Sequence, residues 1–134
     1  MFRLALLSLL YLFLMLVIVV AWRELRPAAV ERRRQAVFEV LDPGRAPVAR
    51  GERIGVVGGA SVGRAAGNDV RFDEDSVSSR HALISVTGGR WWLEDLGSTN
   101  GTFVNDARVT GRAPLRNGDV VQVGLVSARF LVRS

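Results

Sequence analysis

The sequence predicts an all-β sandwich preceded by a single transmembrane α-helix. Near the amino terminus, Leu4–Trp22 carries no charged residue and consists largely of Leu, Val and Ile. From Gln35 onward the apolar runs are short and are separated by Gly, Asn and Asp, as is typical of strands and turns. We therefore divide the chain into a transmembrane signal-anchor helix at 1–22, a basic juxtamembrane linker at 23–34 and a β domain at 35–134.

The segment Leu4–Trp22 has the length of a membrane span. As a helix it would extend about 28 Å, close to the ~30 Å thickness of the hydrocarbon core. Trp22 and Arg23 suit the headgroup level at its far end. A cleaved signal peptide is the alternative, because Val19-Val20-Ala21 resembles a weak cleavage site. The apolar core of a signal peptide is usually only about 7–15 residues long, which favours the anchor.

The linker predicts the orientation of the span. Arg23–Arg34 holds five Arg and two Glu, whereas only Arg3 precedes the span. The positive-inside rule therefore predicts a single-pass protein of the cell membrane, with its amino terminus outside and its β domain in the cytoplasm. The same arginines attract anionic headgroups, so membrane lipid is an expected partner. Pro27 is expected to interrupt any helix that continues out of the membrane.

The β domain contains eight candidate strands and about 100 residues, enough to enclose a core. Alternation of apolar and polar residues is clearest in Ala82–Val86 and Val120–Val123. Glycine and asparagine turn signals separate the runs, among them Gly88-Gly89 and Asn117-Gly118-Asp119. The candidate strands are Ala36–Leu41, Arg53–Val57, Val70–Phe72, Ala82–Val86, Trp91–Asp95, Thr102–Val104, Val120–Val123 and Ala128–Val132. The candidate core residues are Phe38, Val70, Phe72, Leu83, Ile84, Trp92, Leu93, Phe103, Val121 and Phe130.

Composition excludes several kinds of site. Cysteine is absent and His81 is the only histidine, so disulfides, thiolate metal sites and His-rich metal sites are excluded, and no cofactor is expected. The net charge of +5 resides mostly outside the β domain. Arg3 and Arg23–Arg34 supply four of these charges, so 35–134 carries only +1. That balance is a poor match to a phosphate polymer, and nucleic acid is not expected as a partner.

Three short strings supply the chemistry suited to a phosphate group. Gly63-Arg64 and the run Ser78-Ser79-Arg80-His81 precede Leu96–Thr102, which contains Ser98, Thr99 and Asn100. A guanidinium donates parallel N–H groups to a phosphate, and hydroxyls and amides add further donors. Taken alone, Arg64 would more often be a surface ion pair, Ser78 a loop cap and Asn100-Gly101 a tight turn.

In this order the strings resemble those of a forkhead-associated (FHA) domain. The resemblance rests on Gly63-Arg64, Val77–Ala82, Leu93–Asn105 and Leu115–Asp119, and it covers roughly Gln35 to Val132. It implies an FHA-type antiparallel β-sandwich of eleven strands that binds phosphothreonine peptides with the loops at one end. With its anchor, the chain is also similar to short membrane-tethered FHA proteins of actinobacteria, which are found beside Ser/Thr kinases and cell-wall synthesis factors.

The resemblance also implies roles for individual residues. Arg64 and Ser78 match positions that hold the phosphate, and Asn100 matches the asparagine that binds the peptide main chain. His81 is expected to be structural, bonding across the loops. The expected binding residues are Arg64, Ser78, Ser79, Arg80, Thr99 and Asn100, supported by Gly63, His81 and Gly101.

Two enzymatic interpretations are rejected on sequence grounds. Ser78 and His81 suggest a nucleophile and base, but both come from one short loop without an elbow motif. Gly58–Ala65 has the spacing of a P-loop, but Arg64 and Ala65 replace its lysine and its hydroxyl residue. We therefore expect a non-enzymatic, membrane-anchored adaptor that recruits proteins phosphorylated by Ser/Thr kinases, in the setting of cell division or the cell wall. The alternative is a phosphorylation-independent scaffold that uses the sandwich face or the transmembrane helix.

The partner is expected to come in trans. Arg23–Ala60 contains no Ser or Thr, so this part of the chain cannot supply its own phosphothreonine. A membrane Ser/Thr kinase or one of its substrates would suit a domain held this close to the bilayer, because confinement raises their effective concentration.

Overall fold

The computed structural model describes the backbone of residues 1–31 and 34–133, and all side chains in these ranges except those of 25–31. The described chain forms two compact units, residues 1–30 and 31–134. Arg32 and Arg33 of the predicted linker, and Ser134, lie outside the described residues.

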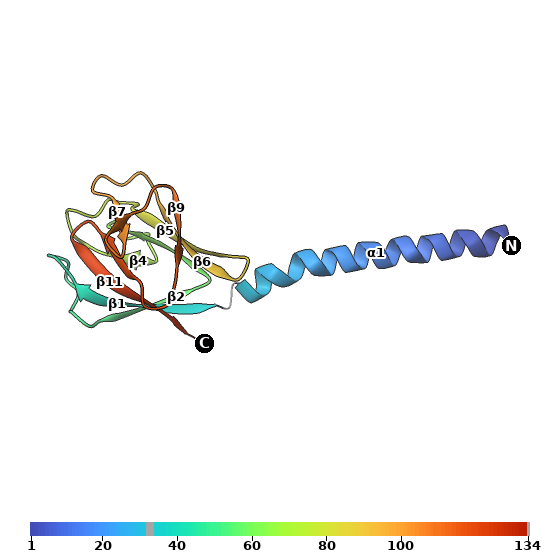
Figure 1. The fold of residues 1–134 in the computed structure, drawn as a ribbon, viewed down its shortest axis with the longest axis horizontal. Helices are drawn as coiled ribbons and strands as arrows, with labels where there is room; N and C mark the ends of the chain where they lie inside the picture. Colours follow the sequence, from blue (N-terminus) through green and yellow to red (C-terminus); the bar gives the residue numbers. More distant parts are fainter. Residues whose placement is uncertain (32–33, 134) are drawn as a thin grey trace. The chain divides into compact units, whose positions relative to one another are not determined.

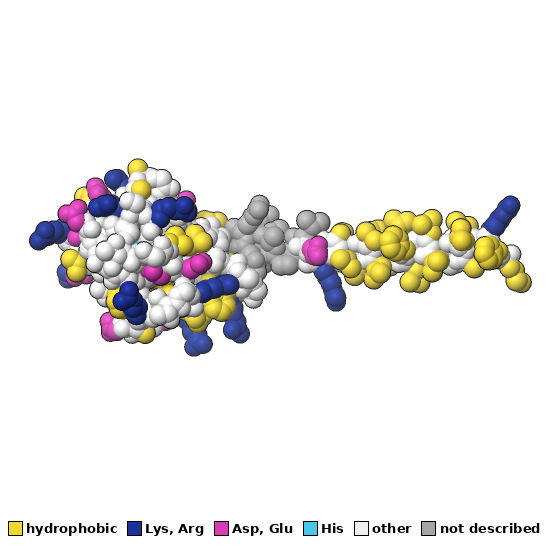
Figure 2. Space-filling model, turned by 90° about the horizontal axis from the view of Figure 1, so that it is seen from above, with side chains coloured by type: hydrophobic (Ala, Val, Ile, Leu, Met, Phe, Trp, Pro, Cys, Tyr) yellow, Lys and Arg dark blue, Asp and Glu magenta, His cyan; other side chains and the backbone are white. Residues whose placement is uncertain are grey.

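The first unit is one long helix, α1 (Phe2–Glu31). Its segment Phe2–Glu24 is long and apolar enough to cross a membrane, and Figure 2 shows hydrophobic side chains along its visible face. The expectation that Pro27 would end the helix is wrong, because α1 continues to Glu31. Proline removes one hydrogen bond at a cost of about 3 kcal/mol. The flanking Leu25, Ala28 and Ala29 are strong helix formers, which favour continuation.

The second unit is a sandwich of two sheets (Figure 1). Within the described residues, the first sheet has the order β2-β1-β11-β10-β7-β8 and the second β4-β3-β5-β6-β9. Only β3 and β4 pair in parallel among the pairings of the described strands. The strands are β1 (Gln35–Asp42), β2 (Arg53–Val57), β3 (Gly59–Gly63), β4 (Val70–Arg71), β5 (Ala82–Thr87), β6 (Arg90–Asp95), β7 (Thr102–Val104), β8 (Ala107–Arg108), β9 (Arg112–Leu115), β10 (Val120–Val123) and β11 (Val126–Arg133).

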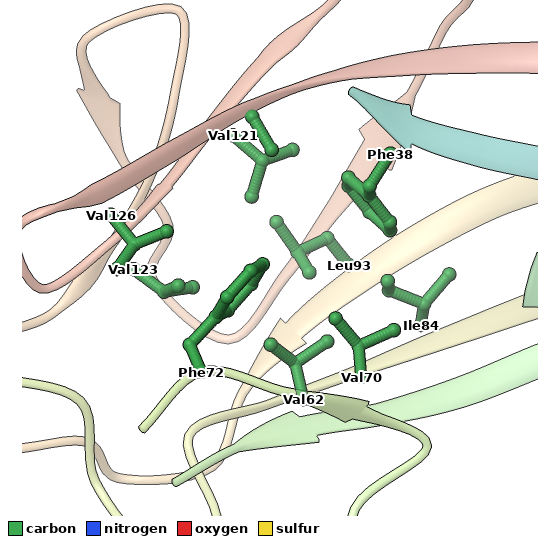
Figure 3. Close-up of a pocket in the computed structure, with 10 residues that line it drawn as sticks. Phe38, Val62, Val70, Phe72, Ile84, Leu93, Val121, Val123 and Val126 are labelled. Carbon is green, nitrogen blue, oxygen red and sulfur yellow. The ribbon is translucent and has the colours of Figure 1, made fainter. Parts of the chain in front are cut away.

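The core lies between the two sheets. Figure 3 shows Phe38 and Val121 from one sheet facing Ile84 and Leu93 from the other. These side chains enclose an apolar void of only about 10 Å³, which is about the size needed for one water molecule and too small for a ligand. The core is built entirely within residues 36–130, so the sandwich has what it needs to fold without the helix.

Three of the predicted core residues lie elsewhere. Leu83, Trp92 and Phe103 are only half-buried, whereas Trp91 is 3 % exposed and packs edge-on against Phe130. Successive residues of a strand point to opposite faces, so Leu93 and Trp92 cannot both face the core. Trp92 instead lies on the outer face, where the Arg112 guanidinium stacks 4.2 Å from its ring centroid.

Candidate functional site

Three loops meet at one end of the sandwich and are bonded to one another. They are the β3–β4 loop (64–69), the β4–β5 loop (72–81) and the β6–β7 loop (96–101). The Arg64 amide donates to the Ser78 carbonyl at 2.9 Å, which joins the first loop to the second. The Thr99 amide donates to Ser78 Oγ at 3.1 Å, which joins the third. The sequence-predicted residues 64, 78 and 99 are thereby brought together.

Arg64 begins the β3–β4 loop with its side chain 42 % exposed. Its carbonyl accepts a hydrogen bond from Arg71 Nε at 3.0 Å, which fixes the backbone from which the guanidinium extends. One guanidinium nitrogen lies 3.9 Å from a carboxylate oxygen of the fully exposed Asp75. A contact this long on the surface is weak, so the guanidinium remains available to an anion.

Gly63 is required by the close approach of two loops. A Cβ at this position would lie 2.3 Å from the Ser79 carbonyl oxygen and 2.8 Å from Asn68 Nδ2. Because a backbone oxygen cannot give way as the end of a flexible side chain can, any other residue would separate the loops. Gly63 therefore lets the β4–β5 loop approach the backbone beside Arg64; its support of a binding site stays a prediction.

Asn68 is a supporting residue that the sequence analysis missed. Its Nδ2 donates to the Ala65 carbonyl at 2.9 Å and to the Ser79 carbonyl at 2.7 Å. Both donors of one amide group thus close the β3–β4 loop and attach it to the β4–β5 loop. The only sequence signal was an Asn in a Gly-Asn-Asp turn, which by itself indicates no partner eleven residues away.

Ser78, Ser79 and Arg80 lie on the β4–β5 loop with different exposure. Ser78 is half-buried, and since its Oγ accepts from the Thr99 amide, its own hydroxyl proton remains available for donation. Ser79 and Arg80 are exposed. Within the described residues the Arg80 guanidinium forms no ion pair, so the loop presents one hydroxyl that the fold has oriented and one additional cation.

His81 is fully buried and joins two loops. Its Nδ1 accepts from the Ser78 amide at 3.0 Å, and its Nε2 lies 2.9 Å from the Gly101 carbonyl oxygen. An amide is always a donor and a carbonyl always an acceptor, so the ring is neutral with its proton on Nε2. Both ring nitrogens are occupied by backbone groups, and neither bonds to the Ser78 hydroxyl. His81 thus links the β4–β5 loop to the β6–β7 loop, while its role in supporting a binding site stays a prediction.

Thr99 and Asn100 are exposed residues of the β6–β7 loop. Asn100 Nδ2 donates to the Ser76 carbonyl at 2.7 Å, leaving its second N–H and its Oδ1 for other partners. Ser76 in turn bonds through its hydroxyl to the buried Glu74 and to the Leu125 amide. Ser76 is a second supporting residue that the sequence analysis missed.

Asp95, at the end of β6, organises the β6–β7 loop. Its carboxylate accepts from Ser98 Oγ at 2.5 Å, from Thr102 Oγ1 at 2.7 Å and from the Gly97 amide at 3.1 Å. Burial acts to raise the pKa of Asp95, but the hydrogen bonds from Ser98 and Thr102 outweigh it and hold the pKa below its usual value. The Asp-Leu-Gly-Ser string could have revealed this turn, because Asp commonly bonds to the amide two residues later.

Gly101 completes the loop with a positive φ of 85°. Its amide donates to Ser98 Oγ at 3.0 Å while its carbonyl accepts from His81. The residue is therefore held from both sides in a conformation that glycine adopts without strain. Gly101 thereby connects the Asp95 turn to the buried His81, and its support of a binding site stays a prediction.

Together the three loops form a shallow cationic and hydroxyl-rich surface. Arg64 and Arg80 supply positive charge, and Ser78, Ser79 and Thr99 supply hydroxyls. Among the described residues, no group of three or more His, Asp or Glu is placed to hold a metal ion. An arrangement of donors around a guanidinium suits the binding of a multiply charged oxyanion.

Comparison with known proteins places these loops in a recognised domain family. The FHA domain profile matches residues 60–124, which include all three loops. FhaB, an FHA domain-containing protein of Mycobacterium tuberculosis, is 41 % identical over 63 residues, which cover 47 % of this chain and 41 % of FhaB. The chain thus spans about two fifths of the length of this relative.

Solved structures extend the likeness to nearly the whole sandwich. The FhaA FHA domain, solved in complex with the intracellular domain of another protein, is 31 % identical, with a TM-score of 0.59. The match covers 73 % of this chain and 99 % of that one. An FHA domain from a study of phosphothreonine-dependent interactions is 30 % identical, with a TM-score of 0.63 over 75 % of this chain and 98 % of that one. Because the profile and both solved domains converge on one sandwich, this chain belongs to the forkhead-associated (FHA) domain family.

Proposed function

We propose that this FHA domain binds phosphothreonine-containing proteins in trans through Arg64, Ser78, Ser79, Arg80, Thr99 and Asn100. The observation that carries the proposal is the bonding of three separate loops around Ser78, which holds the Arg64 backbone and the Thr99 amide at fixed positions. FHA domains act as phosphopeptide-binding adaptors rather than enzymes.

The phosphate matches the charge and the donors of this surface. A phosphothreonine carries about −1.5 to −2 charges and three strong acceptor oxygens. Arg64 can donate two parallel N–H bonds to it, and Ser78 can add its free hydroxyl proton. Because the loops are already bonded together, little conformational entropy is lost when the ligand binds.

Asn100 is suited to the peptide main chain beside the phosphate. One amide proton is committed to Ser76, which fixes the orientation of the side chain. The remaining N–H and the Oδ1 oxygen match the carbonyl and N–H that a peptide backbone offers. The Asn100 side chain can therefore hold the β6–β7 loop against Ser76 and contact the peptide main chain at the same time.

The proposal includes a membrane anchor. Phe2–Glu24 would cross the cell membrane once, with the amino terminus outside and the FHA domain in the cytoplasm, as the flanking arginines favour. A solved FHA domain in complex with the intracellular domain of another protein supports a partner in trans. We propose a membrane Ser/Thr kinase or its substrates as that partner, in the setting of cell division or the cell wall.

The test is fluorescence anisotropy with the full chain in detergent micelles. Labelled peptides carrying phosphothreonine, phosphoserine or unmodified threonine are compared. Arg64→Ala should weaken phosphothreonine binding at least about tenfold, since each hydrogen bond to a charged group contributes about 1.5–3 kcal/mol. Arg90→Ala is the matched control, because Arg90 is exposed at the opposite end of β6 from the loops.

The control should bind like the unmodified chain. Equal binding of phosphorylated and unmodified peptides would refute the phosphothreonine proposal and favour the phosphorylation-independent scaffold. Phosphothreonine-selective binding that Arg64→Ala leaves unchanged would refute the proposed site. The outer sheet face around Trp92 and Arg112 would then be the next surface to alter.

A further inference from the structure

The end of the sandwich opposite the three loops gathers arginines from four parts of the chain. Arg34 directly precedes β1, Arg90 begins β6, Arg116 follows β9 and Arg133 ends β11. We term these four the entry-end arginines, because the polypeptide enters the sandwich at Gln35. Hydrogen bonds and strand pairing show that they share one end.

Arg34 lies between two turns. Its carbonyl accepts from the Gly58 amide at 2.8 Å, in the β2–β3 turn. Its guanidinium passes close to Gly89 in the β5–β6 turn, where a Cβ would lie 3.3 Å from Arg34 Nη2. Arg90 follows directly after Gly89, so Arg34 and Arg90 lie at the same end of the sandwich.

The other two arginines reach the same end through β11. Gln35 pairs with Arg133 in the β1–β11 register. The Val132 amide donates to Asn117 Oδ1 at 2.8 Å, which attaches the turn containing Arg116 to the last residues of β11. Four cations are thus presented by the chain entry, one hairpin, one turn and one strand terminus.

Among the described residues, these four guanidinium groups form no ion pair. All four residues are exposed, and among the described residues the ion pairs within 4.0 Å involve other arginines. Asp119 also lies at this end, but its carboxylate accepts from the Asn105 side chain and the Arg116 amide. The other acid at this end is Asp106, in the β7–β8 turn.

An exposed apolar side chain accompanies the charges. Val57 pairs with Gln35 in the β1–β2 register and is 61 % exposed. Within the described part of the sandwich, Val57 and Leu125 are the large apolar residues that are this exposed, and Leu125 lies at the opposite end with Ser76. Several cations around one apolar side chain suit the polar–apolar boundary of a bilayer.

We propose that the entry end of the sandwich is a docking surface for anionic lipid headgroups. This proposal rests on the proposed function in one respect: the membrane anchor is what keeps the sandwich close to a bilayer. Residues 25–34 join the span to β1, and even fully extended they reach no more than about 35 Å. The end of the sandwich at which the chain enters from the anchor is also the end that carries these arginines, so the short connection keeps their charge within reach of the headgroups.

Docking at this end leaves the phosphopeptide site free. Arg90 and Asp95 stand at opposite ends of β6, about 17 Å apart at the usual rise per residue. Lipid contact and peptide binding can therefore occur together. The sandwich would be held with its three loops directed away from the headgroups, which restricts the directions from which a partner can approach.

The experiment measures co-sedimentation of residues 34–134, which contain the complete core, with lipid vesicles. Vesicles of phosphatidylcholine alone are compared with vesicles of equal parts phosphatidylcholine and phosphatidylglycerol. The test variant is Arg90→Gln/Arg116→Gln/Arg133→Gln. The matched control, Arg45→Gln/Arg50→Gln/Arg129→Gln, removes the same charge from exposed arginines elsewhere.

The unmodified fragment should bind the anionic vesicles and not the neutral ones. Each arginine near an anionic surface contributes about fivefold in affinity, so the test variant should bind at least about tenfold more weakly while the control changes little. Absence of binding to anionic vesicles would overturn the proposal. Equal losses in the two triple variants would also overturn it, because net charge rather than this surface would then be responsible.

Vesicle binding by this fragment can succeed or fail independently of the proposed phosphothreonine binding. The fragment lacks α1, so its vesicle binding does not depend on whether the helix anchors the chain. Phosphopeptide affinity measured on the same two variants should match that of the unmodified fragment. Loss of peptide affinity in the entry-end variant would instead indicate that the substitutions disturb the whole sandwich, and it would count against a separate lipid surface.

Discussion

At the residue scale, Gly63 lets two loop backbones approach more closely than any side chain would allow. A Cβ on residue 63 would lie only 2.3 Å from the carbonyl oxygen of Ser79 in the β4–β5 loop. This approach brings the Ser78 carbonyl to the Arg64 amide. The position of the guanidinium is thus set by the absence of a side chain on the preceding residue.

Gly63→Ala should therefore damage stability and binding together. Forcing an atom into this contact costs about 1–3 kcal/mol, and the displaced loop no longer presents Ser78. Chemical denaturation and peptide anisotropy would measure the two effects. Gly67→Ala is the control, because nothing lies within 4 Å of a Cβ there, and it should leave both quantities nearly unchanged.

Asp75 is the acid nearest to Arg64 and should compete with the phosphate. Its pairing with Arg64 is exposed and long at 3.9 Å, so the pairing is weak and a bound phosphate can displace it. Asp75→Asn should strengthen phosphopeptide binding by about 1.5- to 5-fold. Asp73→Asn is the comparison, since Asp73 pairs with Arg71 at 3.6 Å. A titration in which Asp75→Asn weakens binding would contradict this competition.

The sequence could identify candidate site residues that belong to a recognisable motif. It could not identify residues whose hydrogen-bond partners lie far away in the sequence. Arg64, Ser78, Thr99 and Asn100 lie on the converging loops, although their part in binding stays a prediction. Asn68 was missed because its partner carbonyl is eleven residues away. A string of letters does not show that an amide and a carbonyl on different loops will meet.

At the element scale, the β6–β7 loop depends on the Asp95 carboxylate. Hydrogen bonds lower the pKa of Asp95 in the folded state, so the folded chain binds fewer protons than the unfolded chain at acidic pH. The stabilisation is complete above the unfolded value of about 3.9 and is lost as the pH falls through the lower folded value.

Asp95→Asn should remove this acid dependence. The variant should be less stable at neutral pH by about 1–3 kcal/mol, because Asn offers one uncharged acceptor oxygen and an NH2 donor where Asp95 has two oxygens that accept hydrogen bonds. Its stability should then decline less than that of the unmodified chain on acidification. Urea unfolding at a series of pH values measures both effects, with the exposed Asp106→Asn as control. An unchanged acid profile would show that Asp95 does not organise the loop.

Eight of the strands in the described residues were predicted from the sequence, whereas β3, β8 and β9 were not. Arg53–Val57, Thr102–Val104 and Val120–Val123 match β2, β7 and β10 residue for residue. β3 was not among the candidate strands; its Gly59 and Gly63 weaken the strand pattern and lie where another backbone approaches closely. β9 was missed because it contains Pro114, which an edge strand tolerates and a central strand does not.

At the scale of the whole molecule, the chain joins one long apolar helix to an FHA sandwich with a separate core. If Phe2–Glu24 anchors the chain, expressed protein should remain in the membrane pellet after alkaline carbonate washing and be released by detergent. A chain lacking residues 1–33 should be released from the membranes by the same carbonate wash. Intact mass of the membrane form would distinguish an anchor from a cleaved signal peptide, since cleavage near Ala21 would remove the span.

The strand order has a mechanical consequence. β1 is central, with β11 on one side and β2 on the other, and it pairs with β11 from Gln35 to Asp42. A force applied between the polypeptide before Gln35 and a ligand held at the opposite loops acts along the strands. The ladder hydrogen bonds lie across that direction, so they are loaded in shear and must break together rather than one after another. The β1–β11 pairing is therefore oriented to resist a pulling force applied between Gln35 and a ligand bound at the three loops.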